Sequence, residues 1–429
     1  MIKTLMSMVV GVMLGLGALL IAKPFTDRLA VGPAQATTGE AAASELGERC
    51  VPAGQWIRPS DGIPLDHASV LSDAAKRPIV LLGETHTNQE DHRWQLHTIA
   101  ALHALKSNMV LAFESFPRRV QPVLDRWIRG ELSEAEFLKA TEWNDVWRYD
   151  PSGYLPLFYF ARMHRLPMVA MNVDISLVRR VGREGWDSVP EDERLGLTRP
   201  APAPLGYLDK LASVTAMKAR HSGKEAEPVD YDDPDFRRFV DAQQVWDRAM
   251  AEAMAGVAKG GGDPLVVGIV GRGHLEYDHG IPNQLIDLGL PDSLVLLPWS
   301  EARSCRGFSG PRGEAVADAV FGTLPYQPAP EVERPRLGVF IEGLEGEDAP
   351  GILIRDVVDG SIAEAAGLMP GDVLIMAAGL DLAQPSDLTR LIGRQAPGTW
   401  LPLTLRRDGE AKDVVARFPP EVVQVGAKP

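Results

Sequence analysis

Two short segments of the sequence place a histidine three residues after a glycine. The first is Gly83-Glu84-Thr85-His86 and the second is Gly271-Arg272-Gly273-His274. A further carboxylate, Glu114, directly follows an apolar run. Neutral imidazoles combined with carboxylates suit a divalent transition metal that activates water. These residue types therefore define a candidate site, provided that the fold brings them together.

Each candidate residue also has a structural interpretation. Glu84 and Thr85 are suited to capping a following helix, and a lone histidine after a turn is more often structural than a ligand. The presence of two similar turns shifts that balance toward function. Burial of Glu114 without a partner would be costly, so we expect a cation or a metal beside it. His92, about one helical turn beyond His86, is a reserve ligand. The remaining histidines considered are interpreted as surface or helix-packing residues: His97, His103, His164 and His279.

Apolar runs with the length of buried strands precede these polar residues. They occupy residues 79–82, 109–113, 168–171 and 265–270, and we expect Glu114 to follow the second and Asn172 and Asp174 to follow the third. Helix-length segments separate these runs. One begins at Asn88, and the others occupy residues 121–140, 155–164 and 236–258. Such alternation predicts an α/β domain, with a mostly parallel sheet wound with helices. In such sheets the carboxyl ends of the strands form the ligand crevice.

Composition excludes several classes of protein. The 429 residues include 44 basic and 58 acidic side chains, giving a formal net charge of −14. A general nucleic-acid binder is excluded because no basic surplus is available to neutralise phosphates. The two cysteines, Cys50 and Cys305, are too far apart in the sequence for a C-x-x-C metal site and too few for a disulfide-rich scaffold. These two cysteines either form one disulfide in an oxidising compartment or remain two inert thiols, and the sequence favours neither alternative.

The amino-terminal segment is predicted to direct the chain to a membrane. Residues 5–22 carry no charge, and their length lies between that of a signal-peptide core and that of a spanning helix. The triplet Ala34-Gln35-Ala36 resembles a signal-peptidase site but lies far from the apolar core. We interpret residues 1–36 as a signal peptide or membrane anchor, favouring the retained anchor, and residues 37–50 as a linker. No lipobox precedes Cys50.

Changes of composition divide the rest of the chain. We assign residues 51–324 to the α/β domain, with a Pro-rich and charged insertion at 185–234. Leu208, Leu211, Val214 and Met217 recur at three-residue spacing in that insertion and predict a helix. We interpret this helix as a lid over the crevice, with packing on its own domain as the alternative. A Pro-rich linker at 325–335 precedes a β-rich unit at 336–420 and a tail at 421–429.

Gly83 to His86, the segment Ala112-Phe113-Glu114-Ser115 and Gly271 to His274 resemble the ChaN family of haem-binding uptake proteins. This family lies in the Tiki/TraB/erythromycin-esterase-like superfamily, and the resemblance continues to Gly280-Ile281-Pro282. It implies a haem-binding α/β domain, often a homodimer enclosing haems between subunits, on the periplasmic face of a bacterial envelope and involved in haem or iron uptake. The protein would be membrane-anchored or secreted to the periplasm. The chain departs from the family in lacking a lipobox, which argues against attachment as a lipoprotein.

The resemblance implies two alternative sets of site residues. In a haem pocket, Tyr154, His86 and His274 are candidate iron ligands and Arg272 a cofactor-binding residue. Candidate propionate partners are Arg118, Arg119, Arg179 and Arg180. In a periplasmic metal-dependent hydrolase of this superfamily, His86, His274, Glu84 and Glu114 would hold a divalent transition metal, with Glu84 or Glu114 as the catalytic base. We favour a haem-binding protein without a reaction of its own.

The β-rich unit resembles a PDZ domain of bacterial envelope proteases. The resemblance rests on Ser361-Ile362-Ala363-Glu364-Ala365-Ala366-Gly367-Leu368 and on Pro370-Gly371-Asp372. We expect strands at 337–341, 351–357, 372–376 and 400–406. In PDZ domains an extended peptide or protein carboxyl terminus adds to a strand beside a helix. The corresponding residues here are Leu337, Gly338, Val339, Phe340, Leu388 and Ile392. The alternatives are a PDZ fold without a ligand, and a chain in which the PDZ unit alone is active.

Overall fold

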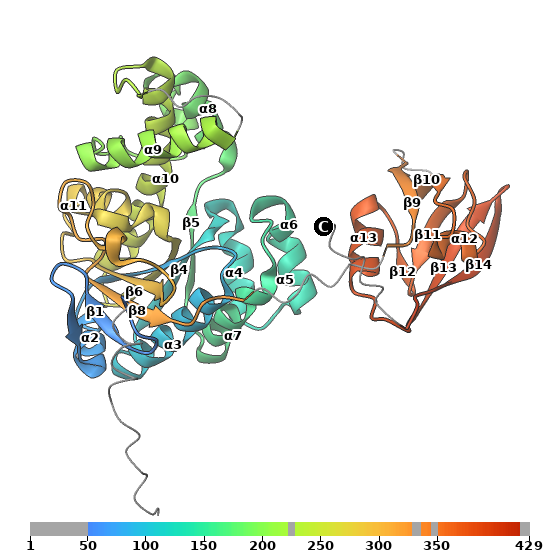
Figure 1. The fold of residues 1–429 in the computed structure, drawn as a ribbon, viewed down its shortest axis with the longest axis horizontal. Helices are drawn as coiled ribbons and strands as arrows, with labels where there is room; N and C mark the ends of the chain where they lie inside the picture. The colour runs from blue at the N-terminus through green and yellow to red at the C-terminus, as the bar shows by residue number, and fades with distance from the viewer. Residues whose placement is uncertain (1–49, 222–227, 328–335, 345–350, 421–429) are drawn as a thin grey trace, which may run out of the picture. The chain divides into compact units, whose positions relative to one another are not determined.

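A computed structural model describes residues 50–221, 228–327, 336–344 and 351–420 (Figure 1). The chain divides into two compact units, one ending at Pro325 and the other beginning at Tyr326. The predicted signal or anchor at 1–36, most of the linker at 37–50 and the tail at 421–429 lie outside the described residues. Within the described part of the chain, no helix combines the length and apolar character needed to span a bilayer.

The first unit is built on a mixed eight-stranded sheet with the order β2-β1-β8-β7-β3-β6-β4-β5. Six adjacent strands are parallel to one another: β3 (Ile79–Glu84), β4 (Met109–Pro117), β5 (Met168–Asn172), β6 (Leu265–Gly271), β7 (Leu294–Ser300) and β8 (Ala319–Thr323). Strands β1 (Trp56–Arg58) and β2 (Ile63–Leu65) add an antiparallel edge. Strand β3 lies in the centre, between β6 and β7. The predicted fold class is confirmed.

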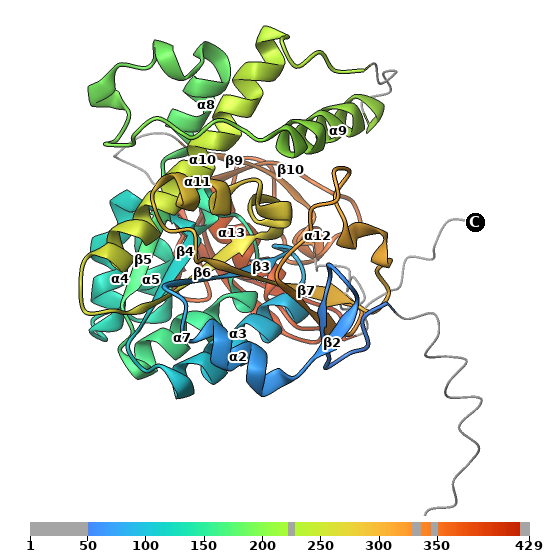
Figure 2. The same cartoon turned by 90° about the vertical axis from the view of Figure 1, so that its left-hand side faces the viewer.

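Helices cover both faces of this sheet because its strands are apolar on both sides. Val80 and Leu82 belong to one core and Ile79 and Leu81 to the other, as the alternation of a strand requires. The first core includes residues of α2 (His67–Ala74), α3 (Gln89–Leu105), α4 (Gln121–Ile128), α5 (Glu134–Ala140), α6 (Trp143–Val146) and α7 (Leu155–His164). The second includes residues of α10 (Pro234–Lys259) and α11 (Ile281–Asp287). Figure 2 shows α3 and α7 on one side of the sheet and α10 and α11 on the other.

Two predicted boundaries were wrong. Strand β4 does not stop before Glu114, because it continues to Pro117 and pairs again with β5 at Asn172 after an irregularity. The helix expected at 121–140 is divided into α4 and α5. Gly130 adopts a positive φ of 80° between them, and Ser133 begins α5 with a reciprocal capping box to Glu136.

The insertion forms a small helical layer. Its predicted helix is present as α9 (Leu205–His221), and Figures 1 and 2 show it with α8 (Ile175–Glu184) beside the first half of α10. Tyr207 and Leu211 of α9 form an apolar cluster with Phe236 and Val240 of α10. The insertion is therefore anchored to the longest helix of the domain.

The second unit is an antiparallel sheet of order β14-β13-β11-β10-β9, with β12 beside β11. Its strands are β9 (Val339–Gly343), β10 (Ile352–Val357), β11 (Val373–Ala377), β12 (Leu380–Asp381), β13 (Trp400–Arg407) and β14 (Glu410–Arg417). Its helices are α12 (Ile362–Ala365) and α13 (Pro385–Gly393). The four strands expected from the sequence are present within one or two residues.

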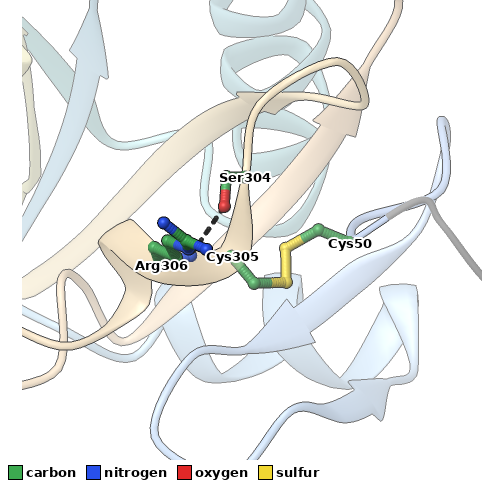
Figure 3. The surroundings of a disulfide bond; sticks show 4 residues. All are labelled: Cys50, Ser304, Cys305 and Arg306. Atoms are coloured by element: carbon green, nitrogen blue, oxygen red, sulfur yellow. Dashed lines mark hydrogen bonds between the residues drawn. A yellow bond between two sulfur atoms is a disulfide. The ribbon is translucent and has the colours of Figure 1, made fainter.

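Cys50 and Cys305 form a disulfide, which resolves the alternative left open by the sequence (Figure 3). Their Cα atoms lie 5.4 Å apart although 255 positions separate them in the sequence. The bond ties the start of the first unit to the short helix η7 (Cys305–Phe308), which follows β7. It therefore closes almost the whole unit into one covalent loop.

We predict that Cys305→Ser lowers the free energy of unfolding of the first unit by about 2–5 kcal/mol, because a long loop is released in the unfolded chain. Thermal melting under non-reducing conditions measures the effect. Dithiothreitol should lower the melting temperature of the wild type and leave that of the variant unchanged. Two titratable thiols in the unreduced, unfolded wild type would contradict the bond.

Candidate functional site

The first Gly-x-x-His turn surrounds a buried carboxylate at the end of the central strand. Glu84 is 2% exposed and its Oε1 accepts hydrogen bonds from His86 Nδ1 at 2.8 Å and from the hydroxyl of Tyr154 at 2.5 Å. His92 Nε2 of α3 lies 3.2 Å from Glu84 Oε2. Strand β3 supplies the carboxylate, while α3 and the start of α7 supply its neighbours.

The charges of this group support one another. Burial alone would raise the pKa of Glu84, but the imidazoles of His86 and His92 outweigh it and lower that pKa to about 2. Burial lowers the pKa of His86, yet Glu84 and Glu114 reverse the effect, and its net shift is upward. Burial and the adjacent Glu84 carboxylate raise the pKa of Tyr154 strongly. Tyr154 therefore remains a neutral hydrogen-bond donor to Glu84.

The second turn repeats this arrangement with residues from other elements. His274 Nδ1 lies 2.7 Å from Asp247 Oδ1 of α10, and the Tyr207 hydroxyl of α9 donates to Asp247 Oδ2 at 2.7 Å. Asp247 is fully buried. Burial lowers the pKa of His274, but Asp247 and then Glu114 raise it above the ordinary value. At each turn, therefore, a tyrosine donates to a buried carboxylate, and the same carboxylate contacts the histidine of the turn.

Both histidines use Nδ1 to contact a carboxylate, which leaves Nε2 for another partner. This is the arrangement that orients a metal-ligating imidazole and strengthens it as a ligand. Glu114 lies between the turns: its Oε2 accepts from the Gly271 amide at 2.6 Å, and its Oε1 is 3.6 Å from His274 Nε2. A Cβ on Gly271 would lie 2.7 Å from His86 Cε1 and 2.9 Å from His86 Nε2. Glycine at this position is what admits the imidazole.

The structure brings His86, His274, Glu84 and Glu114 to one rim, as the pattern of strand ends suggested. Among the described residues, however, no group of three or more His, Cys, Asp or Glu side chains is arranged to hold a metal ion. The assignment of these four residues as metal ligands stays a prediction. Tyr154 is also at this rim, but its hydroxyl is engaged by Glu84.

Sequence reasoning missed two members of the site and named a third only as a reserve ligand. That third residue, His92, is 4% exposed and contacts Glu84. Asp247 lies in the middle of α10 and Tyr207 in the first turn of α9, and no local motif connects either of them with His274. The apolar periodicity of α9 indicated only that this helix exists.

Most of the arginines considered as propionate partners are engaged elsewhere. Arg118 donates to the Ala249 carbonyl at 2.7 Å. Arg119 bonds to Glu142 and Asp174, Arg180 bonds to Glu184 and Glu193, and Arg179 is exposed. Arg272 instead lies within the second turn, where its Nε donates to Glu276 Oε1 at 2.7 Å. Of the arginines considered, Arg272 is the one in the site itself.

The predicted peptide-binding residues of the second unit lie on β9, just before it and on α13. Strand β9 is an edge of the sheet, and Phe340 on it is 62% exposed. Leu337, Leu388 and Ile392 belong to the buried core. Gly338 has a φ of 84°, and a Cβ there would lie 2.2 Å from Ser361 Cβ. An edge strand preceded by a tight glycine turn is a suitable place for strand addition.

Comparison with known proteins agrees with this division. A model of the family described as haem-binding uptake, Tiki superfamily, ChaN matches residues 70–285, and a PDZ-domain model matches residues 335–416. A probable periplasmic serine endoprotease, DegP-like, of Hahella chejuensis is 34% identical over 95 residues, covering 20% of each chain. RETICULATA-RELATED 5, chloroplastic, of Arabidopsis thaliana is 27% identical over 170 residues, covering 39% of this chain and 22% of that protein. The matches thus span about a fifth of these relatives' lengths.

A solved structure described as cofacial heme binding to ChaN of Campylobacter jejuni is also similar. It is 15% identical, with a TM-score of 0.46, and the alignment covers 62% of this chain and 95% of that chain.

We predict that each carboxylate controls its own histidine. Glu84→Gln should lower the pKa of His86 and leave that of His274 nearly unchanged, and Asp247→Asn should do the reverse. Histidine ¹H–¹⁵N spectra recorded against pH measure both groups. Because a raised folded-state pKa stabilises the fold below the unfolded value of about 6.5, this stabilisation should disappear as the pH rises through the folded-state pKa. Equal shifts of both histidines in either variant would contradict two independent pairs.

Proposed function

The chain belongs to the ChaN family of haem-binding uptake proteins in the Tiki superfamily, and from this premise we propose that its first unit binds haem. The observation that carries the proposal is the pair of anchored histidines, His86 and His274, each with Nε2 directed away from its carboxylate partner. When bound, haem would supply an iron atom for which imidazole nitrogen is a suitable ligand. The donor set of this rim therefore fits the cofactor that the family binds.

The same contacts divide the roles of the site residues. We assign His86 and His274 as the candidate iron ligands, because Glu84 and Asp247 hold their Nδ1 atoms. Tyr154 and Tyr207 position those carboxylates by donating hydrogen bonds. Of the three candidate ligands, Tyr154 is the one that we do not assign to the iron, because its hydroxyl donates to Glu84 and its pKa is strongly raised.

We further propose that this protein handles or takes up haem at the periplasmic face of a bacterial envelope. The apolar segment within residues 1–36 supports export, with the segment either retained as an anchor or removed. The Cys50–Cys305 disulfide supports an oxidising compartment. A homodimer is part of this proposal because haems enclosed between subunits are what the family resemblance implies.

A metal-dependent periplasmic hydrolase is the second candidate. It is favoured by the carboxylate–histidine pairs, which suit a divalent transition metal as well as haem iron. Glu114, 3.6 Å from His274 Nε2, would then act as a ligand or as a base toward water. Metal analysis of the protein as isolated separates the candidates: stoichiometric zinc, manganese or cobalt that is lost in the double variant His86→Ala, His274→Ala favours the hydrolase.

We predict that residues 37–429 bind haem saturably, with a Soret shift and about one haem per chain, because each chain has one rim that carries His86 and His274. His86→Ala or His274→Ala should weaken binding or change the Soret spectrum by removing a nitrogen ligand. Tyr154→Phe should keep an imidazole-type spectrum. Absorbance titration of the purified protein measures all three variants.

Phe160→Leu is a matched control for loss of an aromatic ring in α7 outside the Glu84 group. A spectrum that changes in Tyr154→Phe but remains unchanged in both histidine variants would restore the phenolate as the iron ligand. Absence of any saturable Soret response in the wild type would overturn haem binding itself.

The second unit is a PDZ domain, and we propose that it binds a peptide or a protein carboxyl terminus. Among the described residues β9 is an edge strand of the sheet, and a peptide in an extended conformation can pair with such a strand. The exposed ring of Phe340 provides apolar contact beside that edge. A PDZ fold without a ligand remains the alternative interpretation.

We predict that panning of the full chain against a library of free carboxyl-terminal peptides selects apolar terminal residues. Amidation of a selected peptide should reduce its affinity by about tenfold or more, because the terminal carboxylate loses its amide partners. Phe340→Glu should also weaken binding, whereas Val415→Glu on the opposite edge strand should not. Isothermal titration measures these differences, and equal binding of amidated and free peptides would contradict groove recognition.

A further inference from the structure

Three cationic side chains converge on one carboxylate beside the second turn. Glu276 lies 2.7 Å from Arg272 Nε, 3.1 Å from Lys210 Nζ and 3.6 Å from Arg303 Nη2. The side chain of Glu276 is only 13% exposed. Lys210 comes from α9, Arg272 from the turn after β6, and Arg303 from the loop after β7. One carboxylate is thus shared by cations from three separate elements.

The cluster is held on an aromatic surface. The guanidinium of Arg303 lies 4.1 Å from the ring centroid of the buried Trp299, and that of Arg272 lies 5.2 Å from the same centroid. Both arginines are therefore fixed by stacking as well as by charge. The side chain of Arg303 is nevertheless 40% exposed, so one face of this cluster is open to solvent.

One hydrogen-bond donor of the cluster has no acceptor among the described residues, so it could bind an anion. Arg272 Nη2 is buried and has no hydrogen-bond partner among the described residues. A second carboxylate, Asp91, faces the two arginines, but its Oδ2 already accepts the Thr85 amide at 2.8 Å. Three cations thus face two carboxylates, and one guanidinium nitrogen is unsatisfied. A buried unsatisfied donor of this kind is costly unless a partner binds there.

This cluster is contiguous with the proposed haem site. Arg272 stands between Gly271, which admits His86, and His274 in the same turn. Lys210 Nζ also donates to the Gly273 carbonyl at 2.8 Å, so α9 contacts this turn directly. The Cys50–Cys305 bond holds the loop two residues beyond Arg303. Imidazoles and cations therefore occupy neighbouring parts of one rim.

We propose that Arg272, Arg303 and Lys210 form an anion subsite that binds the carboxylates of an amphipathic ligand. Resting on the proposed haem function, the subsite would take the propionates, with Glu276 holding the cations in position when no ligand anion is present. Guanidinium groups pair with carboxylates through two parallel hydrogen bonds, and Arg303 is the exposed group that can do so. Lys210 makes the insertion helix a part of the ligand site.

The test compares haem with haem dimethyl ester, in which both propionates are uncharged, in absorbance titrations of residues 37–429. The wild type should bind the ester about tenfold more weakly or worse, corresponding to the loss of at least one charge-assisted hydrogen bond. Arg303→Gln should weaken binding of haem to a similar extent and leave binding of the ester nearly unchanged. Arg129→Gln, an exposed arginine paired with Glu131 elsewhere, is the matched control. Added salt should weaken haem binding more than ester binding.

The outcomes separate the two proposals. Saturable binding of both ligands with equal affinity would overturn the anion subsite and leave haem binding standing. The same would follow if Arg303→Gln and Arg129→Gln bound haem equally. No saturable response to haem in the wild type would overturn the haem function and the subsite with it. The wild-type comparison of haem and ester decides the question even if Arg303→Gln fails to fold.

Discussion

The site depends on the burial of a charged carboxylate at the end of the central strand. Glu84 is almost inaccessible to solvent and remains ionised, because imidazoles approach both of its oxygens and a phenol donates to one. Removing one partner from such a group leaves an uncompensated buried charge, which is far more costly than the net value of the interaction. This constraint fixes the position of His86, the start of α7 and the inward face of α3 around one carboxylate.

At the second turn a buried carboxylate likewise contacts the histidine, and a residue of the insertion donates a hydrogen bond to that carboxylate. Asp247 is buried in α10, and the hydroxyl that supports it comes from Tyr207 in α9. Lys210, one helical turn later, contacts the backbone of the turn itself. The insertion thus supplies a hydroxyl that supports the carboxylate beside His274 and a cation that contacts the turn.

The sequence predicted well whatever is encoded locally. Uninterrupted apolar runs indicated β3, β5 and β6, and the two glycine–histidine turns indicated which edge of the sheet carries chemistry. It failed where tertiary contacts decide: Glu114 lies inside β4 because its pairing with β5 resumes beyond an irregularity. Asp247 and His92 look like ordinary polar helix residues, and only packing shows that each is buried against a member of the site. The disulfide likewise joins positions too distant in sequence for spacing to link them.

One short turn carries both His274 and Arg272, and this places an imidazole next to a cation. In this short 3₁₀ segment, Arg272–His274, successive side chains diverge around the axis. His274 is drawn toward Asp247, while Arg272 is drawn toward Glu276 and Trp299. A flat ligand with a metal centre and charged edges needs both kinds of contact at a fixed separation. The turn holds His274 and Arg272 at such a separation through the backbone.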